Sequence, residues 1–223
     1  RKALIESGLK LSDIDLFSAT CGPGLIGGLL IGSTFAKSLS TGCSKPFVPI
    51  NHIEGHVLSP TYNNVISYPH LSLLISGGHT EIYFIENEKK ISLIAESVDD
   101  ALGETFDKVG KVLGLKYPGG PEIEYFAKNG NELKYKLPTP MLKDKSLNMS
   151  FSGIKTAVNL LVKNNIVDNR FISDVAASFQ FCIANILTGK LSKTILKLKD
   201  SSINISSISV VGGVINNNYI RKK

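Results

Sequence analysis

The residues best suited to chemistry are two histidines in the segment Asn51-His52-Ile53-Glu54-Gly55-His56. Residues four apart lie on one face of a helix, so both imidazoles could bind the same metal ion. Two ligands are too few for such a site, and a third, usually a carboxylate, would have to come from elsewhere. On spacing alone, a hydrogen-bonded pair at a helix start capped by Asn51 stays open as the other interpretation.

Glu54 does not stand where a zinc peptidase needs its glutamate. In the peptidase motif H-E-x-x-H the glutamate follows the first histidine directly, so that it reaches the metal-bound water. Here Ile53 holds that position and Glu54 lies on another face of the helix. The spacing therefore argues against peptide hydrolysis by that geometry.

Two glycine pairs follow apolar runs and could bind phosphate. Leu74-Ile75 leads into Ser76-Gly77-Gly78, whose backbone N–H groups are not shielded by large side chains and could hold phosphate or carboxylate oxygens. An ordinary hairpin turn is the alternative. Gly212-Gly213 ends the last apolar run, and ligands of open α/β sheets bind at the carboxyl ends of strands. A P-loop signature, GxxxxGK[ST], does not occur in the sequence.

Acidic residues gather on one predicted helix. Asp100, Glu104, Asp107 and Lys108 fall at helical spacing. A carboxylate that faces a cleft could hold a ribose hydroxyl, whereas a solvated charged helix face is the plainer interpretation. Both remain open from the sequence.

Two further segments could contact a ligand. Residues 117–121 form a Pro/Gly loop in which Gly120 would allow close approach, or which simply joins two helices. Residues 150–156 place hydroxyls and a lysine at a helix start, an arrangement that suits an anion or simple capping equally well.

The composition indicates a soluble, cytoplasmic protein with an anionic partner. The 223 residues are 43% hydrophobic and carry a formal charge of +6, which fits a nucleotide or RNA ligand. Three cysteines without a CxxC pair favour a reducing compartment. We expect no signal peptide and no membrane span, because the apolar stretch near residues 24–31 is short and glycine-rich.

The order of predicted elements indicates an α/β protein. Strand, helix, strand and helix come first, followed by a three-strand meander near residues 71–96, several helices and a last strand at 203–211. The long helix at 173–198 is predicted to break or kink near Gly189. A meander followed by helix–strand units is typical of a ribonuclease-H-like half, and two such halves facing a cleft make the actin/Hsp70-like ATPase fold. We expect the first half at 1–66 and an incomplete second half at 67–223.

Six ordered motifs together carry a family resemblance. CGPGLIGGLLIG, NHIEGH, LLISGGHTE, ESVDDALGETFDKVGKVLGLKYPGGP, SFSGIKT and VVGGVINN resemble successive signatures of the TsaD family, also called Gcp or YgjD, over essentially the whole chain. The resemblance implies the actin/Hsp70-like fold. It also implies transfer of a threonylcarbamoyl group from threonylcarbamoyl-adenylate to N6 of adenosine 37 in tRNAs that read codons beginning with A. Leu74 and His79 place the chain with the bacterial and organellar branch.

The resemblance also implies the site residues. One divalent metal ion, iron or zinc, would be held by His52 and His56 together with an aspartate nearer the C-terminus. The catalytic residues stay unknown, because the sequence shows no convincing nucleophile dyad. The substrate-binding positions that match the family are Leu74, Ile75, Ser76, Gly77, Gly78, Asp107, Gly120, Glu124 and Asn217.

Two family motifs have no counterpart among these residues: an E-T-S-C-D-like strand at the start and a T-D-N-G motif that carries the third metal ligand. We therefore expect this segment alone to bind metal weakly and to have little or no transferase activity. The implied partners are tRNA, TsaB and the ATPase TsaE. The alternatives are a glycoprotease-like metalloprotease and a non-catalytic scaffold like TsaB.

Overall fold

The computed structural model describes residues 2–62 and 66–223. The chain divides into two compact units, residues 1–59 and 60–223. The boundary expected from the sequence, between 66 and 67, and the assignment of the two parts to ribonuclease-H-like halves stay predictions. The expected loop at 62–68 lies partly outside the described residues.

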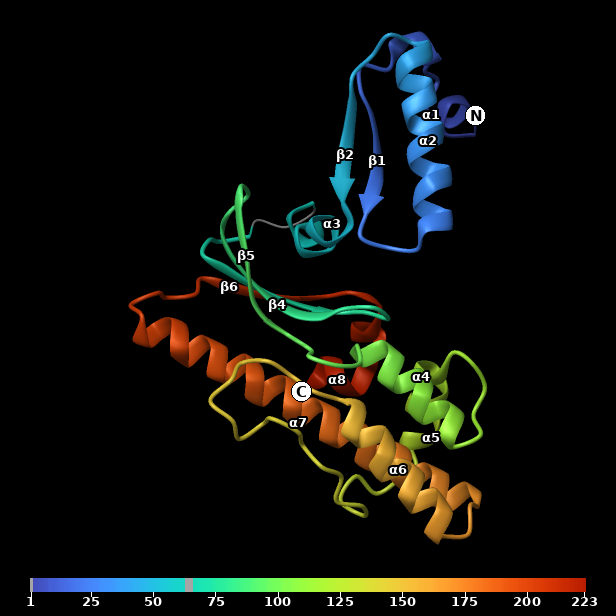
Figure 1. Ribbon diagram of the computed structural model, residues 1–223, viewed down its shortest axis with the longest axis vertical. Helices are drawn as coiled ribbons and strands as arrows, with labels where there is room; N and C mark the ends of the chain where they lie inside the picture. Colours follow the sequence, from blue (N-terminus) through green and yellow to red (C-terminus); the bar gives the residue numbers. More distant parts are fainter. Residues whose placement is uncertain (1, 63–65) are drawn as a thin grey trace. The chain divides into compact units, whose positions relative to one another are not determined.

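Strands and helices alternate along the chain in the first unit. It contains α1 (Lys2–Ser7), β1 (Phe17–Gly22), α2 (Ile26–Gly42), β2 (Phe47–Asn51) and α3 (His52–Val57), with a short 3-10 turn at Leu11–Asp13. β1 and β2 pair in parallel, and α2 is the crossover between them (Figure 1). The predicted cap of α3 is confirmed: the Asn51 side chain accepts hydrogen bonds from the backbone N–H groups of Ile53 and Glu54, at 2.8 and 3.2 Å.

The second unit contains a four-stranded sheet. Its strands are β3 (His70–Ile75), β4 (Thr80–Asn87), β5 (Lys90–Glu96) and β6 (Ser207–Val211), in the order β5-β4-β3-β6. β3, β4 and β5 form the predicted antiparallel meander, and β6 returns parallel to β3. The carboxyl ends of β3 and β6 therefore lie side by side, which is where ligands bind in open α/β sheets.

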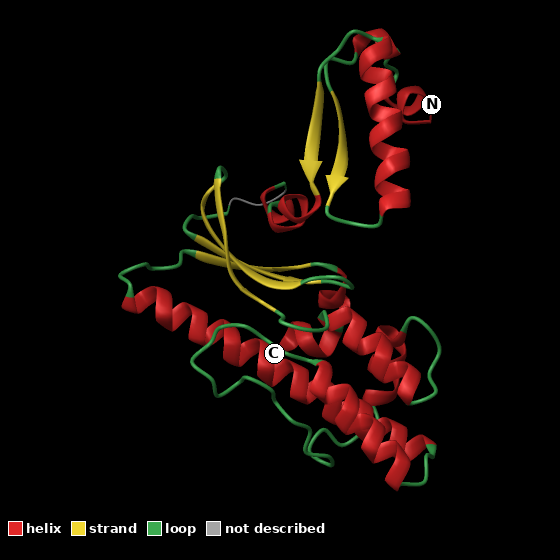
Figure 2. Ribbon diagram, viewed as in Figure 1, coloured by secondary structure: helices red, strands yellow, loops and turns green. Residues whose placement is uncertain are grey.

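Helices cover one face of this sheet (Figure 2). They are α4 (Leu102–Val112), α5 (Gly119–Ala127), α6 (Ser152–Asn164), α7 (Asn169–Asp200) and α8 (Asn218–Lys222), with a 3-10 turn at Gly213–Asn216. Another 3-10 turn, Ser59–Thr61, spans the boundary between the units. Alternate residues of β3, among them Leu71 and Leu73, join the buried core with these helices. At its centre the rings of Phe106 and Phe179 meet edge to face, with centroids 4.9 Å apart.

The predicted break in the long helix is wrong. α7 runs without interruption over Asn169–Asp200. A Cβ on Gly189 would lie 2.6 Å from Cδ1 of Leu142, so the glycine allows a neighbouring segment to approach closely instead of bending the helix. In the described part of the chain, α7 is the helix whose length and composition could suit a membrane, but 78% of its apolar window is buried in the structure. It is a core helix.

The segment at 131–150 has irregular structure and packs against the second unit. Leu147 and Met149 are buried against the core. Lys190, itself fully buried on α7, donates a hydrogen bond from Nζ to the carbonyl of Ser146 at 2.7 Å, and Lys193 donates to the carbonyl of Leu142. These lysines hold the segment onto α7 by satisfying carbonyls that lack secondary structure.

Candidate functional site

A cavity of about 330 Å³ opens in the second unit at the carboxyl ends of β3 and β6. Three regions far apart in the sequence line it: the turn after β3, the pair α4–α5, and the loop between β6 and α8. The lining residues are Gly77, Gly103, Phe106, Asp107, Pro118, Gly120, Pro121, Glu124, Gly213, Val214, Asn216 and Asn217. Five of the positions expected to bind substrate are thus brought together: Gly77, Asp107, Gly120, Glu124 and Asn217.

The turn after β3 is a hairpin turn that leaves two N–H groups unused. The backbone N–H of Ser76 donates to the carbonyl of His79 at 2.8 Å, and the N–H of His79 donates to Oγ of Ser76 at 3.0 Å. The N–H groups of Gly77 and Gly78 make no hydrogen bond to any described residue. The two interpretations of this segment are therefore compatible, because the turn itself presents free donors. Such donors suit an anionic group.

Leu74 and Ile75 lie differently from the other expected contacts. Both are fully buried in β3. Their side chains support the turn from within the unit and do not line the cavity.

Glycines let α4 and the loop after β6 approach the end of β3. A Cβ on Gly103 would lie 2.7 Å from Cα of Gly77 and 2.8 Å from the carbonyl oxygen of Ser76. Gly212, at φ 98°, lies against the carbonyl of Ile75 in a conformation that side chains rarely adopt. The cavity exists in this form because no larger residue fits at either place.

The acidic residues of α4 have two different roles. Lys108 pairs with Asp100 at 2.6 Å and with Glu104 at 3.0 Å, so these three form the charged helix face that was the plainer interpretation. Asp107 instead lines the cavity, and its Oδ1 accepts the N–H of Gly119 at 2.8 Å. This bond starts α5 at Gly119, whereas the sequence predicted a loop until residue 121. Among residues 2–62 and 66–223, none donates a hydrogen bond to Oδ2 of Asp107, so this oxygen could accept a ligand hydroxyl.

Asn217 is more constrained than the sequence suggested. It is 7% exposed, and its Oδ1 accepts the N–H groups of Tyr219 and Ile220, both at 3.0 Å, which caps α8. Its Nδ2 donates to Oε1 of Gln180 at 2.6 Å. Three of the carboxamide's hydrogen-bonding positions are therefore used within the protein.

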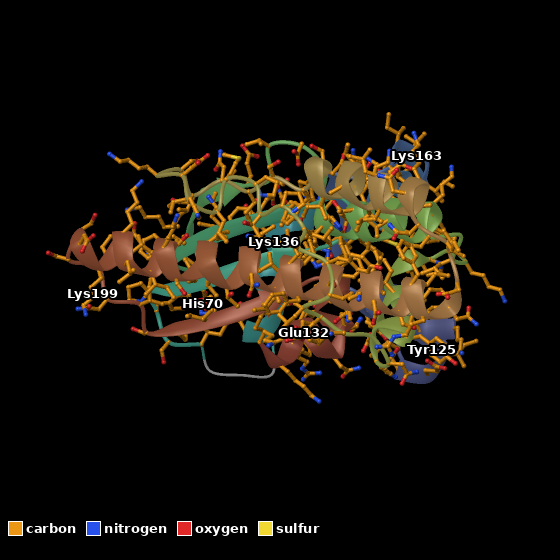
Figure 3. All side chains as sticks on the ribbon, turned by 90° about the horizontal axis from the view of Figure 1, so that it is seen from below. His70, Tyr125, Glu132, Lys136, Lys163 and Lys199 are labelled. Atoms are coloured by element: carbon orange, nitrogen blue, oxygen red, sulfur yellow. The ribbon has the colours of Figure 1, made fainter. Side chains whose placement is uncertain are left out.

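The residues after Asn217 are also fixed from other elements. Oε1 of Glu124 accepts both the N–H and Nδ2 of Asn218, at 3.1 and 2.8 Å. Oε2 of Glu132, which is labelled in Figure 3, accepts the hydroxyl of Tyr219 at 2.5 Å. The loop that closes one side of the cavity is thus held at three successive residues.

The segment at 150–156 is a capped helix start, and its partner was missed in the sequence. Asp99 accepts hydrogen bonds from the hydroxyls of Ser150 and Ser152, at 2.6 and 2.7 Å, and from the N–H of Phe151 at 2.8 Å. Partial burial raises the pKa of Asp99, but these bonds and the N–H of Asp100 outweigh it and hold the pKa at about 2. A negative charge at the first turn of α6 also suits the helix dipole.

In the first unit, the two candidate metal ligands face each other. The rings of His52 and His56 lie 4.6 Å apart between centroids, at 78° to one another, on one side of α3. Within residues 2–62 and 66–223, a group of three or more His, Cys, Asp or Glu side chains that could hold a metal is not found. The pair supplies two side chains of a type that binds zinc, the described residues do not add a third, and metal binding stays a prediction.

Comparison with known proteins decides the family. The family model described as "TsaD: tRNA N6-adenosine threonylcarbamoyltransferase" matches residues 1–223. The chain belongs to this family. Among its relatives, proteins named tRNA N6-adenosine threonylcarbamoyltransferase from Thermosipho africanus and Rickettsia rickettsii are 47% and 46% identical over 100% of the chain. The chain spans 66% and 65% of their respective lengths.

Membership in the TsaD family confirms the resemblance and, with it, the α/β, actin/Hsp70-like fold class. Two solved structures are distantly similar to the chain. YeaZ from Pseudomonas aeruginosa is 18% identical with a TM-score of 0.32, over 42% of this chain and 45% of its own. Component A of the (R)-2-hydroxyglutaryl-CoA dehydratase of Acidaminococcus fermentans is 14% identical with a TM-score of 0.49, over 98% of this chain and 69% of its own.

Proposed function

We propose that the protein containing this chain transfers the threonylcarbamoyl group from threonylcarbamoyl-adenylate to N6 of adenosine 37 in tRNAs that read codons beginning with A. One observation carries the proposal: residues that the TsaD family implies as substrate contacts, from three distant regions of the sequence, line one cavity. The family match over the whole chain supports the same reaction.

The adenylate part of the donor would bind in this cavity. The free N–H groups of Gly77 and Gly78 suit the phosphate oxygens, since a turn with successive free amides binds anions. The carboxylate of Asp107 suits a ribose hydroxyl, because its Oδ2 accepts no hydrogen bond from a described residue. Gly120 leaves open space for the ligand, as a Cβ there would meet nothing within 4 Å.

The reaction joins the exocyclic amine of adenine to the carbamoyl carbon. The nitrogen lone pair attacks that carbon, the bond from the carbon to the phosphate oxygen breaks, AMP leaves with the bonding electrons, and the amine loses a proton. The residues of the cavity would hold the adenylate in place while this happens. Most of the rate enhancement would therefore come from positioning and from stabilising the charge that develops on the leaving phosphate.

His52 and His56 would hold the metal ion, iron or zinc, together with a carboxylate outside the described residues. A bound divalent ion supplies Lewis-acid polarisation of donor oxygens. The facing rings on one side of α3 support this assignment. Peptide hydrolysis is not favoured, because buried Ile53 stands where a peptidase glutamate would be, and a TsaB-like scaffold would not need the histidine pair.

The partners proposed for the complete protein are tRNA, TsaB and TsaE. The net charge of +6 supports binding of the tRNA backbone. All three cysteines, Cys21, Cys43 and Cys182, are free thiols, which fits a cytoplasmic protein.

The test is a transfer assay with the complete gene product. Threonylcarbamoyl-adenylate and an unmodified tRNA that reads such a codon are incubated with it, and the nucleosides are then quantified by mass spectrometry. We expect N6-threonylcarbamoyladenosine to form, and to require His52 and His56. A tRNA in which adenosine 37 is replaced by guanosine is the matched control. No modified nucleoside with the metal-loaded protein and its partners present would refute the proposal.

A further inference from the structure

The strongest unassigned feature is a buried carboxamide pair behind the cavity. Gln180 lies in the middle of α7, is 3% exposed and does not line the cavity that holds Asn217. Its Oε1 nevertheless accepts the amide Nδ2 of Asn217 at 2.6 Å. A glutamine inside a core helix needs a partner, because an unsatisfied buried amide is destabilising. Here the partner is a residue of the proposed binding cavity.

The hydrogen bonds determine the orientation of both amides. The backbone N–H groups of Tyr219 and Ile220 can only donate, so the side-chain atom of Asn217 that faces them must be its oxygen. Its NH2 group therefore faces Gln180, and the atom of Gln180 opposite it must be an acceptor. The orientation of Asn217 is thus fixed from both sides, and no described residue accepts the second N–H of its amide.

We propose that Gln180 is a positioning residue for nucleotide binding: it holds the carboxamide of Asn217 so that its remaining N–H serves the ligand in the cavity. This rests on the proposed function, since it requires an adenylate in that cavity. Without the acceptor on α7, the amide would lose its partner in the interior. The loop that carries Gly213 and Asn217 would then lose its fixed arrangement at the cavity.

The geometry also predicts which substitutions preserve the role. Only an acceptor oxygen is needed at this position, so Gln180→Glu keeps the bond to Nδ2. Gln180 also borders a second, smaller cavity whose charged lining residues are Glu124, Lys128 and Lys222, so two cations and one carboxylate line the cavity beside the new carboxylate. Gln180→Met has a similar size and apolar packing but no comparable acceptor. Comparing these two substitutions therefore separates the effect of the lost hydrogen bond from the effect of a changed side-chain volume.

The experiment is calorimetric titration of AMP into the chain and its variants at fixed salt. We expect Gln180→Met to weaken binding about tenfold, equivalent to about 1.4 kcal/mol, and Gln180→Glu to stay within about twofold. Thermal unfolding of each variant is measured alongside. A residue with a purely structural role would lower the melting temperature in Gln180→Met and leave the AMP dissociation constant unchanged, which would overturn the proposal.

A double-mutant cycle with Asn217→Ala tests whether Gln180 acts through Asn217. If it does, Gln180→Met adds no further loss of AMP affinity once the amide of Asn217 is absent. Independent, additive losses would contradict the proposal while leaving the cavity's role intact. If the wild-type chain does not bind AMP, both the proposed binding cavity and this inference are wrong. If the wild type binds AMP and Gln180→Met binds it equally well, only this inference is wrong, so the two failures are distinguishable.

Discussion

Substitution of Asp99 should remove the hydrogen bonds that connect the start of α6 to the loop after β5, and so lower the stability of the second unit. Its carboxylate joins the loop after β5 to the first turn of α6 through Ser150, Phe151 and Ser152. In Asp99→Ala all these groups lose their acceptor. Loss of a helix cap costs about 1 kcal/mol, and each further hydrogen bond contributes about 0.5–1.5 kcal/mol.

Because Asp99 is an exposed residue, values at the low end apply, and we expect a loss of about 2 kcal/mol. For a chain of this size that corresponds to a melting temperature lower by roughly 4–8 °C. Asp99→Asn keeps Oδ1 for the N–H groups of Phe151 and Asp100, so it should cost about half as much. Differential scanning calorimetry measures both.

The dependence of stability on acid pH provides a second, independent test of the role of Asp99. The pKa of Asp99 is lowered to about 2 from an ordinary value of 3.8, so the unfolded chain binds a proton before the folded one does. The stability from the ionised carboxylate is complete above 3.8 and is lost as the pH falls through about 2. The difference between wild type and Asp99→Ala should therefore be constant near neutral pH and shrink in acid.

The control is Asp200→Asn, which removes an exposed carboxylate at the end of α7 that forms no hydrogen bond or ion pair with the described residues. It should change the stability by less than about 0.5 kcal/mol. An Asp99→Ala protein that melts with the wild type, or a stability difference that does not change between neutral and acid pH, would refute the reasoning.

Four other results are expected. In the complete protein, His52→Ala or His56→Ala should abolish bound metal, as measured by elemental analysis, and full retention of metal in either variant would contradict the assignment. Gly103→Ala should lower the melting temperature by roughly 4–8 °C, from about 2 kcal/mol of overpacking against Ser76 and Gly77; unchanged melting would show that the turn moves freely. Burial lowers the pKa of His70, whose ring nitrogens lie 2.7 and 2.8 Å from the hydroxyls of Ser207 and Ser209 (Figure 3). The unfolded state therefore binds the proton more readily, so stability should fall as the pH drops below 6.5, and His70→Gln should lose that dependence. Finally, tRNA affinity of the complete protein should fall steeply with salt, and a binding constant independent of salt would argue against a backbone contact.

Local patterns predicted much of the fold. The meander followed from short strand-like segments separated by turn signals, and the cap of α3 followed from Asn51 just before a helical pattern. The two errors came from contacts that no local pattern contains. Gly189 suggested a break, but its role depends on Leu142 in a distant segment. The start of α5 depends on a bond from Asp107 to Gly119.

The candidate site shows the same limit. The family motifs located Asp107, Gly120 and Asn217, which the structure brings to one cavity. The motifs did not indicate Gln180, since it lies in an apolar helix where a polar residue has no visible partner in the sequence. The capping role of Asp99 was missed for the same reason, because its partners follow about 50 residues later in the chain. A polar residue inside an apolar helical pattern is the signal that could have drawn attention to Gln180.

The central claim is that an adenylate binds at the carboxyl ends of β3 and β6. Amide hydrogen exchange of the chain with and without AMP tests this most directly, because it locates the protected residues without a substitution. The account predicts protection at residues 76–78, 103–107, 118–124 and 213–217. Protection confined to the separate polar cavity lined by residues such as Asn131, Arg170 and Asp174 would contradict it. An absence of protection at saturating AMP would contradict it as well.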